Sequence, residues 1–108
     1  MRILLDECVP LQVRQALPDH EVATTQGMGW RGLSNGDLLD AAEQAGFTVF
    51  IVADKNLRYQ QNLSARRIAI LELWTNHRPT LEMHFPELHA AAARIRPGEY
   101  LVLEKPSR

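Results

Sequence analysis

The sequence predicts a single α/β domain with a mainly parallel central sheet and helices on both faces. Short apolar runs alternate along the chain with segments of helical periodicity. Several runs are continuous rather than alternating, as in strands buried on both faces of a parallel sheet. A length of 108 residues, with 45% hydrophobic and 23% charged residues, is ordinary for one globular domain. We therefore expect one domain over residues 1–108.

The first quarter of the chain contains two predicted strands joined by a helix. The apolar run Arg2–Leu5 stops at Asp6 and predicts the first, central strand. Pro10 suits the first turn of a helix, whose apolar face continues until Pro18 ends it. His20–Thr24 predicts a second, weaker strand because it is short and polar at both ends.

The middle of the chain predicts a helix followed by the strongest strand. Ser34 is a good N-cap, and Asp37 favours the positive end of the helix that begins there. Gly46 is placed to end this helix. Phe47–Ala53 is rich in β-branched and aromatic residues and stops at another acid, Asp54.

The second half of the chain repeats this pattern. Ile68–Leu73 predicts another strand, and Asn56–Arg67 before it predicts a short helix and a loop. Leu81–Ile95 predicts one helix rich in Ala and Leu in spite of Pro86. The alternating segment Glu99–Glu104 predicts an edge strand.

Composition limits the expected location and partners. The apolar stretches are far shorter than the roughly 20 residues of a membrane-spanning helix. The first residues lack the longer apolar core of a secretory signal. The single cysteine, Cys8, cannot form an internal disulfide, and we expect it simply to pack. We therefore expect a cytoplasmic protein without membrane contact.

A net charge of −1 provides no general attraction to nucleic acid, so any RNA contact must be local, transient or metal-mediated.

Acidic residues follow two of the predicted buried strands. Asp6 and Asp54 occupy these positions, and Asp37 opens a helix that is expected to begin on the same side of the sheet. Ligands of open α/β sheets bind beyond the carboxyl ends of the strands. Carboxylates brought together repel one another unless a cation neutralises them, and Mg²⁺ or Mn²⁺ prefers oxygen ligands. The alternative is that each Asp only serves its own turn or helix cap.

Three segments of the chain resemble the short subgroup of the PIN-like domain family. Ile3–Pro10 is similar to the "LLDEN-P" start of these domains. Gly32–Ala42 resembles their "G-x-S-D-xx-LL-xx-A" helix start, and Phe50–Leu57 resembles their strand followed by "T-x-D-x-D-F". Order and spacing agree over roughly the first 60 residues. The resemblance implies a three-layer α/β/α sandwich of the PIN-like type.

The resemblance also implies a function, namely that of a toxin ribonuclease from a bacterial toxin–antitoxin pair. Asp6, Asp37 and Asp54 match the metal-binding acids of the family and would hold Mg²⁺ or Mn²⁺ for hydrolysis of RNA phosphodiester bonds. Glu7 and Asn56 would support them at the margin of the site. RNA is then the expected substrate and an antitoxin protein the expected partner, while a homodimer is left open.

The residues after Asp54 suggest how RNA would be bound and also suggest an alternative function. Lys55, Arg58 and Tyr59 would guide an RNA backbone towards the metal and stack a base, unless they only form a solvated helix face. Asn56 stands where the family has a second Asp, which lowers the negative charge of the site. The alternative is therefore a catalytically weakened PIN-like module that binds a protein or RNA partner without cleavage.

Overall fold

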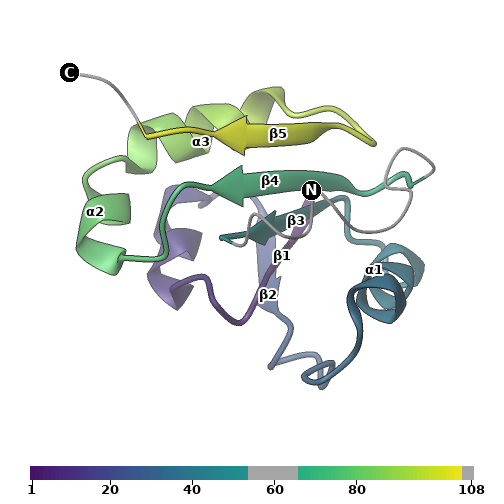
Figure 1. Ribbon diagram of the computed structural model, residues 1–108. Helices are drawn as coiled ribbons and strands as arrows, with labels where there is room; N and C mark the ends of the chain where they lie inside the picture. Colours follow the sequence, from purple (N-terminus) through teal and green to yellow (C-terminus); the bar gives the residue numbers. More distant parts are fainter. Residues whose placement is uncertain (54–65, 106–108) are drawn as a thin grey trace.

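The computed structural model describes residues 1–53 and 66–105, and every structural statement below concerns these residues. A five-stranded sheet crosses the molecule in the order β2-β1-β3-β4-β5, and all of its neighbouring strands are parallel (Figure 1). The strands are β1 (Arg2–Leu5), β2 (Glu21–Thr24), β3 (Val49–Val52), β4 (Ala69–Leu73) and β5 (Tyr100–Leu103). The predicted α/β fold with a parallel sheet is confirmed.

The inner strands of the sheet are the continuous apolar runs of the sequence. All residues of β3 and β4 are buried, because these strands have a neighbour on each side and side chains packed on both faces. β1 is also an inner strand, with Ile3 paired to Val22 of β2 and to Val49 of β3. β5 is an edge strand and is only partly buried, as its alternating sequence predicts.

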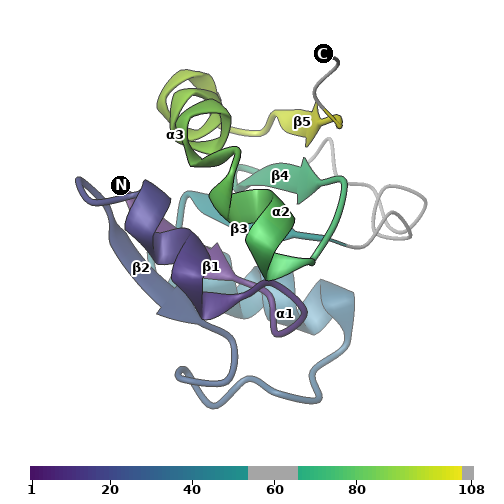
Figure 2. The ribbon, with the colours of Figure 1, turned by 90° about the vertical axis from the view of Figure 1, so that its left-hand side faces the viewer.

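Helices contribute to hydrophobic clusters on both faces of the sheet, and Figure 2 shows them on either side of the strands. The 3-10 helix η1 (Leu11–Ala16) lies on one face together with α2 (Arg78–Glu82) and α3 (Phe85–Arg94). The helix α1 (Asn35–Gln44) lies on the other face. Within the described residues, no helix is long and apolar enough to cross a membrane.

The helix predicted after Pro10 is a 3-10 helix. Its turns are closed by hydrogen bonds of 3.0 Å from the Val13 N–H to the Pro10 carbonyl and from the Leu17 N–H to the Arg14 carbonyl. Bonds that span three residues are typical of 3-10 geometry, which is used for short segments. The segment between Pro10 and Pro18 leaves room for little more than this.

The prediction of a single helix over Leu81–Ile95 is wrong, because the structure has two helices in this region. α2 ends at Glu82 and α3 begins at Phe85. The ring of a proline clashes with the carbonyl of the residue four positions earlier, which for Pro86 is Glu82. Pro86 is therefore accommodated in the first turn of a new helix, where its missing N–H costs nothing.

The junction between α1 and β3 lies two residues later than the sequence predicts. Gly46 ends α1 with a φ of 88°, as expected for a helix stop. The Phe47 N–H then donates to the Ala42 carbonyl and the Thr48 N–H to the Arg2 carbonyl, before β3 begins at Val49. The helix and loop predicted for Asn56–Arg67 fall almost entirely outside the described residues.

Candidate functional site

The strand order places a topological switch point between β1 and β3. From β1 the chain passes through η1 to β2 on one side, and from β2 it passes through α1 to β3 on the other side. The two connections cover opposite faces of the sheet. A crevice forms at the carboxyl ends of the strands where connections diverge in this way, and ligands of open α/β sheets bind there.

Asp6 follows β1 directly at this switch point and is held by its main chain. Its N–H donates to the Ile51 carbonyl of β3 at 3.0 Å, and its own carbonyl accepts from the Val9 N–H at 3.0 Å. The side chain is partly buried, and its Oδ2 accepts a hydrogen bond from the Cys8 Sγ at 3.1 Å. The Asp6 carboxylate therefore has a fixed position at the carboxyl edge of the sheet.

Cys8 does more than the simple packing that the sequence predicts. It packs against the cluster on the η1 face, and its thiol also donates the hydrogen bond to Asp6. Burial first, and then the hydrogen bond to Asp6, raise the pKa of Cys8 to about 11. The thiol therefore stays protonated near neutral pH and remains a donor.

A pocket of about 340 Å³ lies beside Asp6, between the segment after β1 and the end of β2. It is lined by Asp6, Glu7, Val9, Pro10, Leu11, Thr24 and Gln26. Its polar groups include two carboxylates, a hydroxyl and a side-chain amide, and the described lining contains no Lys or Arg. Oxygen donors of this kind are the ligands that Mg²⁺ and Mn²⁺ prefer. The residues present therefore fit a hard divalent cation in kind.

Glu7 and Asp37 are both exposed, and their side chains are less firmly held than that of Asp6. Glu7 forms an ion pair with Arg31 at 3.6 Å in which both side chains are largely exposed. At the start of α1, the Asp37 N–H donates to the Ser34 Oγ at 3.3 Å, which confirms Ser34 as the N-cap. Over residues 1–53 and 66–105, Asp37 makes no hydrogen bond or ion pair with Asp6 or Glu7.

The other predicted site residues lie outside the described part of the chain, namely Asp54, Lys55, Asn56, Arg58 and Tyr59. Among the residues that are described, no three or more His, Cys, Asp or Glu side chains are grouped to hold a metal ion. The convergence of Asp6, Asp37 and Asp54 therefore stays a prediction.

Glu72 is a buried acid that the sequence reasoning missed. It lies in β4 opposite Val52 of β3, close to the carboxyl edge of the sheet, and is 1% exposed. Its Oε1 accepts a hydrogen bond of 2.7 Å from the Tyr100 hydroxyl of β5. A charged residue inside a continuous apolar strand is the signal that could have identified it, because such residues are almost never buried without partners.

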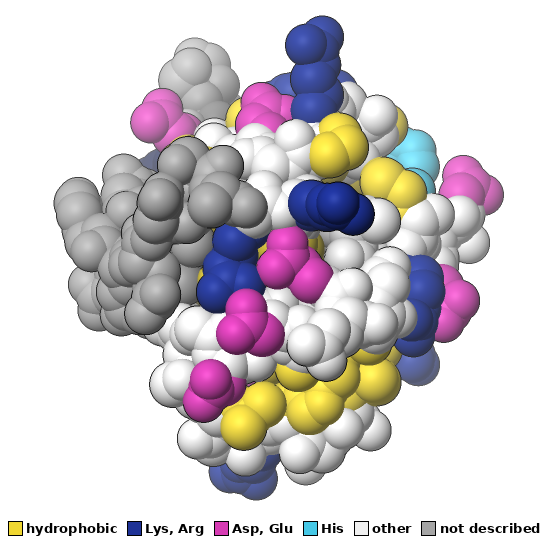
Figure 3. Space-filling model, turned by 90° about the vertical axis from the view of Figure 1, so that its right-hand side faces the viewer, with side chains coloured by type: hydrophobic (Ala, Val, Ile, Leu, Met, Phe, Trp, Pro, Cys, Tyr) yellow, Lys and Arg dark blue, Asp and Glu magenta, His cyan; other side chains and the backbone are white. Residues whose placement is uncertain are grey.

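Charges of both signs are interspersed on the face of the molecule opposite the strand ends just described. Figure 3 shows basic and acidic side chains next to one another there, rather than a continuous basic surface. The structure also pairs Arg66 with Asp40 at 2.7 Å and with Glu43 at 3.0 Å. The described part of this face thus provides no general attraction for RNA.

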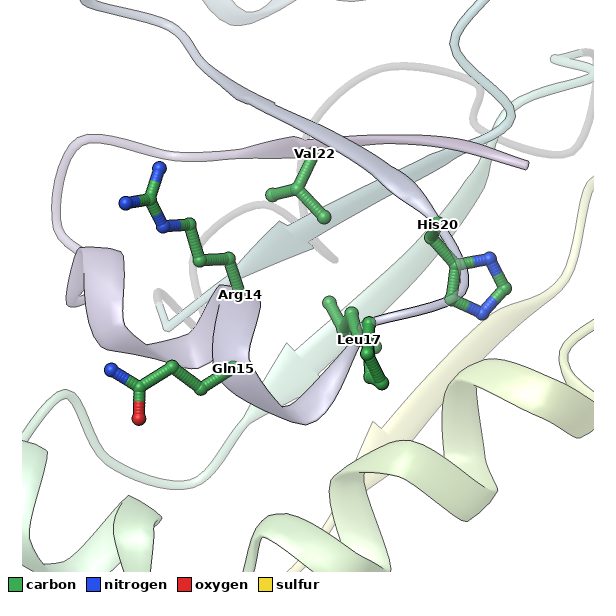
Figure 4. A pocket seen from close by; sticks show the side chains of 6 residues that line it. Arg14, Gln15, Leu17, His20 and Val22 are labelled. Atoms are coloured by element: carbon green, nitrogen blue, oxygen red, sulfur yellow. The ribbon is translucent and has the colours of Figure 1, made fainter.

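A second pocket of about 370 Å³ lies between η1 and the start of β2 (Figure 4). Arg14 and His20 stand at opposite ends of it. The His20 Nδ1 is buried without a hydrogen-bond partner among the described residues, and burial lowers the pKa of His20. Since His20 precedes β2, this pocket lies at the opposite end of that strand from Thr24, away from the Asp6 pocket.

Comparison of the chain with protein-family models, curated proteins and solved structures gave no match. The function is therefore inferred from the residues of this chain and from the geometry around Asp6.

Proposed function

We propose that this chain is a Mg²⁺- or Mn²⁺-dependent ribonuclease of the PIN-like type, acting as the toxin of a bacterial toxin–antitoxin pair. The observation that supports this most is the anchored Asp6 carboxylate at the switch point, beside a pocket lined by oxygen donors. The order and spacing of the three PIN-like segments support it from the sequence.

The proposed chemistry assigns distinct tasks to the metal and to the protein. A divalent ion would polarise the scissile phosphate and lower the pKa of a bound water. The Asp6 carboxylate would hold this ion, together with Asp37 and Asp54 as the further expected ligands. The main-chain bonds of Asp6 to Ile51 and Val9 fix its backbone at the strand ends, and the hydrogen bond from the Cys8 thiol holds its carboxylate. Lys55, Arg58 and Tyr59 are the residues proposed to bind the RNA.

The proposed partners follow from the same site. An antitoxin would inhibit the chain by covering the acidic pocket beside Asp6, where a basic side chain finds Asp6 and Glu7. We also propose that two copies of the chain can form a homodimer. β2 and β5 are the edges of the described sheet, where a second chain can add. The proposed setting is the cytoplasm.

A second candidate function is a PIN-like module that binds RNA or a protein without cutting RNA. Asn56 favours it, because an amide replaces the second acid of the family motif and removes a negative charge near the expected metal. Binding and cleavage therefore need to be measured on the same protein.

Cleavage of a panel of single-stranded RNAs, with Mg²⁺, with Mn²⁺ and with a chelator, tests the proposal. We expect cleavage by the wild-type chain only with metal, and none by Asp6→Asn, which keeps the side-chain size but removes a charge. Asp19→Asn is the matched control, because Asp19 is an exposed acid before β2, at the other end of the strands. Circular dichroism of each variant checks the fold.

The outcomes separate the candidate functions. A folded Asp6→Asn variant that still cuts RNA, or a wild-type chain inert with every metal, contradicts the ribonuclease. RNA binding by an inert wild-type chain supports the non-cleaving module instead.

A further inference from the structure

The two oxygens of the Asp6 carboxylate are not equivalent. Oδ2 accepts the hydrogen bond from the Cys8 thiol at 3.1 Å, whereas no described hydrogen bond or ion pair uses Oδ1. The Asp6 side chain also lines the oxygen-rich pocket. One oxygen is thus engaged by the protein while the other remains for a ligand.

The position of the Cys8 thiol is fixed by core packing and by a backbone turn. Cys8 packs against the hydrophobic cluster on the η1 face, and the next residue, Val9, is 6% exposed within that cluster. The Val9 N–H donates to the Asp6 carbonyl at 3.0 Å, which closes a tight turn over residues 6–9. The turn and the core contacts together fix the Cys8 sulfur relative to the Asp6 carboxylate.

We infer that Cys8 is a positioning residue that restricts Asp6 to metal coordination through one oxygen and so makes the site favour Mg²⁺ or Mn²⁺ over Ca²⁺. This inference rests on the proposed function, because it assumes that Asp6 is a metal ligand. It adds a determinant of metal selectivity that the motif acids alone do not supply.

The selectivity follows from the coordination chemistry of the ions. Ca²⁺ takes about 6–8 oxygen ligands at 2.3–2.6 Å and readily accepts a carboxylate through both oxygens. Mg²⁺ requires near-octahedral geometry at about 2.0–2.1 Å and retains waters. Two-oxygen coordination by Asp6 would bring the cation against Oδ2 and compete there with the Cys8 thiol, whereas one-oxygen coordination through Oδ1 leaves this hydrogen bond undisturbed. Ca²⁺ therefore loses more binding free energy at this site than the smaller ions do.

Direct metal titration of the wild-type chain and of Cys8 variants tests the inference without relying on cleavage. Isothermal titration calorimetry with Mn²⁺, Mg²⁺ and Ca²⁺ gives the ratio of the Ca²⁺ to the Mn²⁺ dissociation constant. Cys8→Ala and Cys8→Val remove the donor, and Cys8→Val retains most of the side-chain bulk if Cys8→Ala folds poorly. Both should lower this ratio by about three- to tenfold, the scale of one hydrogen bond.

Two controls separate the hydrogen bond from packing. Cys8→Ser keeps a donor and should retain the wild-type ratio. Val13→Ala removes volume from the same cluster without touching Asp6 and should retain it too, even if the protein becomes less stable.

The outcomes distinguish this inference from the proposed function. An unchanged ratio in the donor-less variants, or an equal fall in Cys8→Ser, overturns the role of Cys8 while leaving a metal-dependent ribonuclease intact. Metal binding with the expected ratios but no RNA cleavage overturns the ribonuclease and leaves the role of Cys8 standing. A wild-type chain that binds none of the three ions overturns both.

Discussion

The Tyr100 hydroxyl of β5 donates a 2.7 Å hydrogen bond to Glu72 of β4, whose side chain is fully enclosed. Removing this donor with Tyr100→Phe should lower the free energy of unfolding by about 1–3 kcal/mol, because a buried carboxylate loses part of its compensation. Urea unfolding followed by fluorescence or circular dichroism measures the change.

A double-mutant cycle separates this hydrogen bond from the loss of general packing. Glu72→Gln and the double variant complete the cycle, and the coupling between the two positions should be favourable and larger than about 0.5 kcal/mol. A coupling near zero means that the bond between the two side chains contributes little to stability.

Glu43 should matter more to stability than Asp40, although both contact the same Arg66 nitrogen. Glu43 Oε2 also accepts from the Arg67 and Ile68 N–H groups, at 2.7 and 3.2 Å, and thereby ties α1 to the start of β4. Glu43→Ala should lower the free energy of unfolding by about 2 kcal/mol, because several charge-assisted bonds are lost.

Asp40→Ala is the matched control for this prediction. The Asp40 side chain is 61% exposed, so its ion pair with Arg66 is screened by water and its loss should cost less than about 1 kcal/mol. Equal losses in the two variants, measured by urea unfolding, would show that the ion pair to Arg66 is what both residues contribute.

His20 should make the protein less stable in mild acid. Burial, and secondarily the positive N-terminal amino group, lower the pKa of His20 below its ordinary value of 6.5. Its neutral form is therefore favoured in the folded chain, and protonation favours unfolding. This contribution is fully present above about pH 6.5 and is lost as the pH falls through the lowered pKa. Thermal unfolding between pH 5 and pH 8 measures it.

His20→Asn should flatten this part of the stability profile, because Asn does not titrate. His77→Asn is the control, since His77 is exposed at the start of α2. If the His20 variant keeps the full slope between pH 5 and pH 6.5, other groups cause the acid sensitivity.

Gly46 should resist replacement because of its backbone conformation. With a φ of 88°, it occupies a region that side chains with a Cβ disfavour, so Gly46→Ala should cost about 1–2 kcal/mol. Gly46→Asn should cost less, because Asn tolerates left-handed conformations better. Melting temperatures of the two variants give this order, and a Gly46→Ala protein as stable as the wild type would contradict it.

Most of the fold could be predicted because its main signals are local in the sequence. The continuous run Arg2–Leu5 suits a buried strand, and Ser34 and Gly46 mark the ends of α1. The break between α2 and α3 was missed because the apolar residues continue across it, and this pattern outweighed the steric effect of Pro86. Strand order has no local signal at all, since it depends on which faces the connecting helices cover.

The candidate site was predictable only in part, for related reasons. Asp6 could be placed because an acid after a buried strand must lie at the carboxyl edge of the sheet. The hydrogen bond from Cys8 to Asp6 could not be predicted, because it depends on a turn whose geometry the sequence does not specify. Glu72 was hidden in an otherwise apolar strand, and its partner Tyr100 lies in the next strand along the sheet.

The inner position of β1, between β2 and β3, also affects how the chain folds as it leaves the ribosome. Ile3 pairs with Val49 of β3, so a partner strand of β1 emerges 46 residues after it. At translation rates of about 5–20 residues per second, this delay is roughly 2–9 s. Throughout this interval the hydrophobic Ile3-Leu4-Leu5 segment lacks its neighbour on that side. A nascent chain of this topology is thus most exposed to aggregation, and most in need of a chaperone, before β3 has been synthesised.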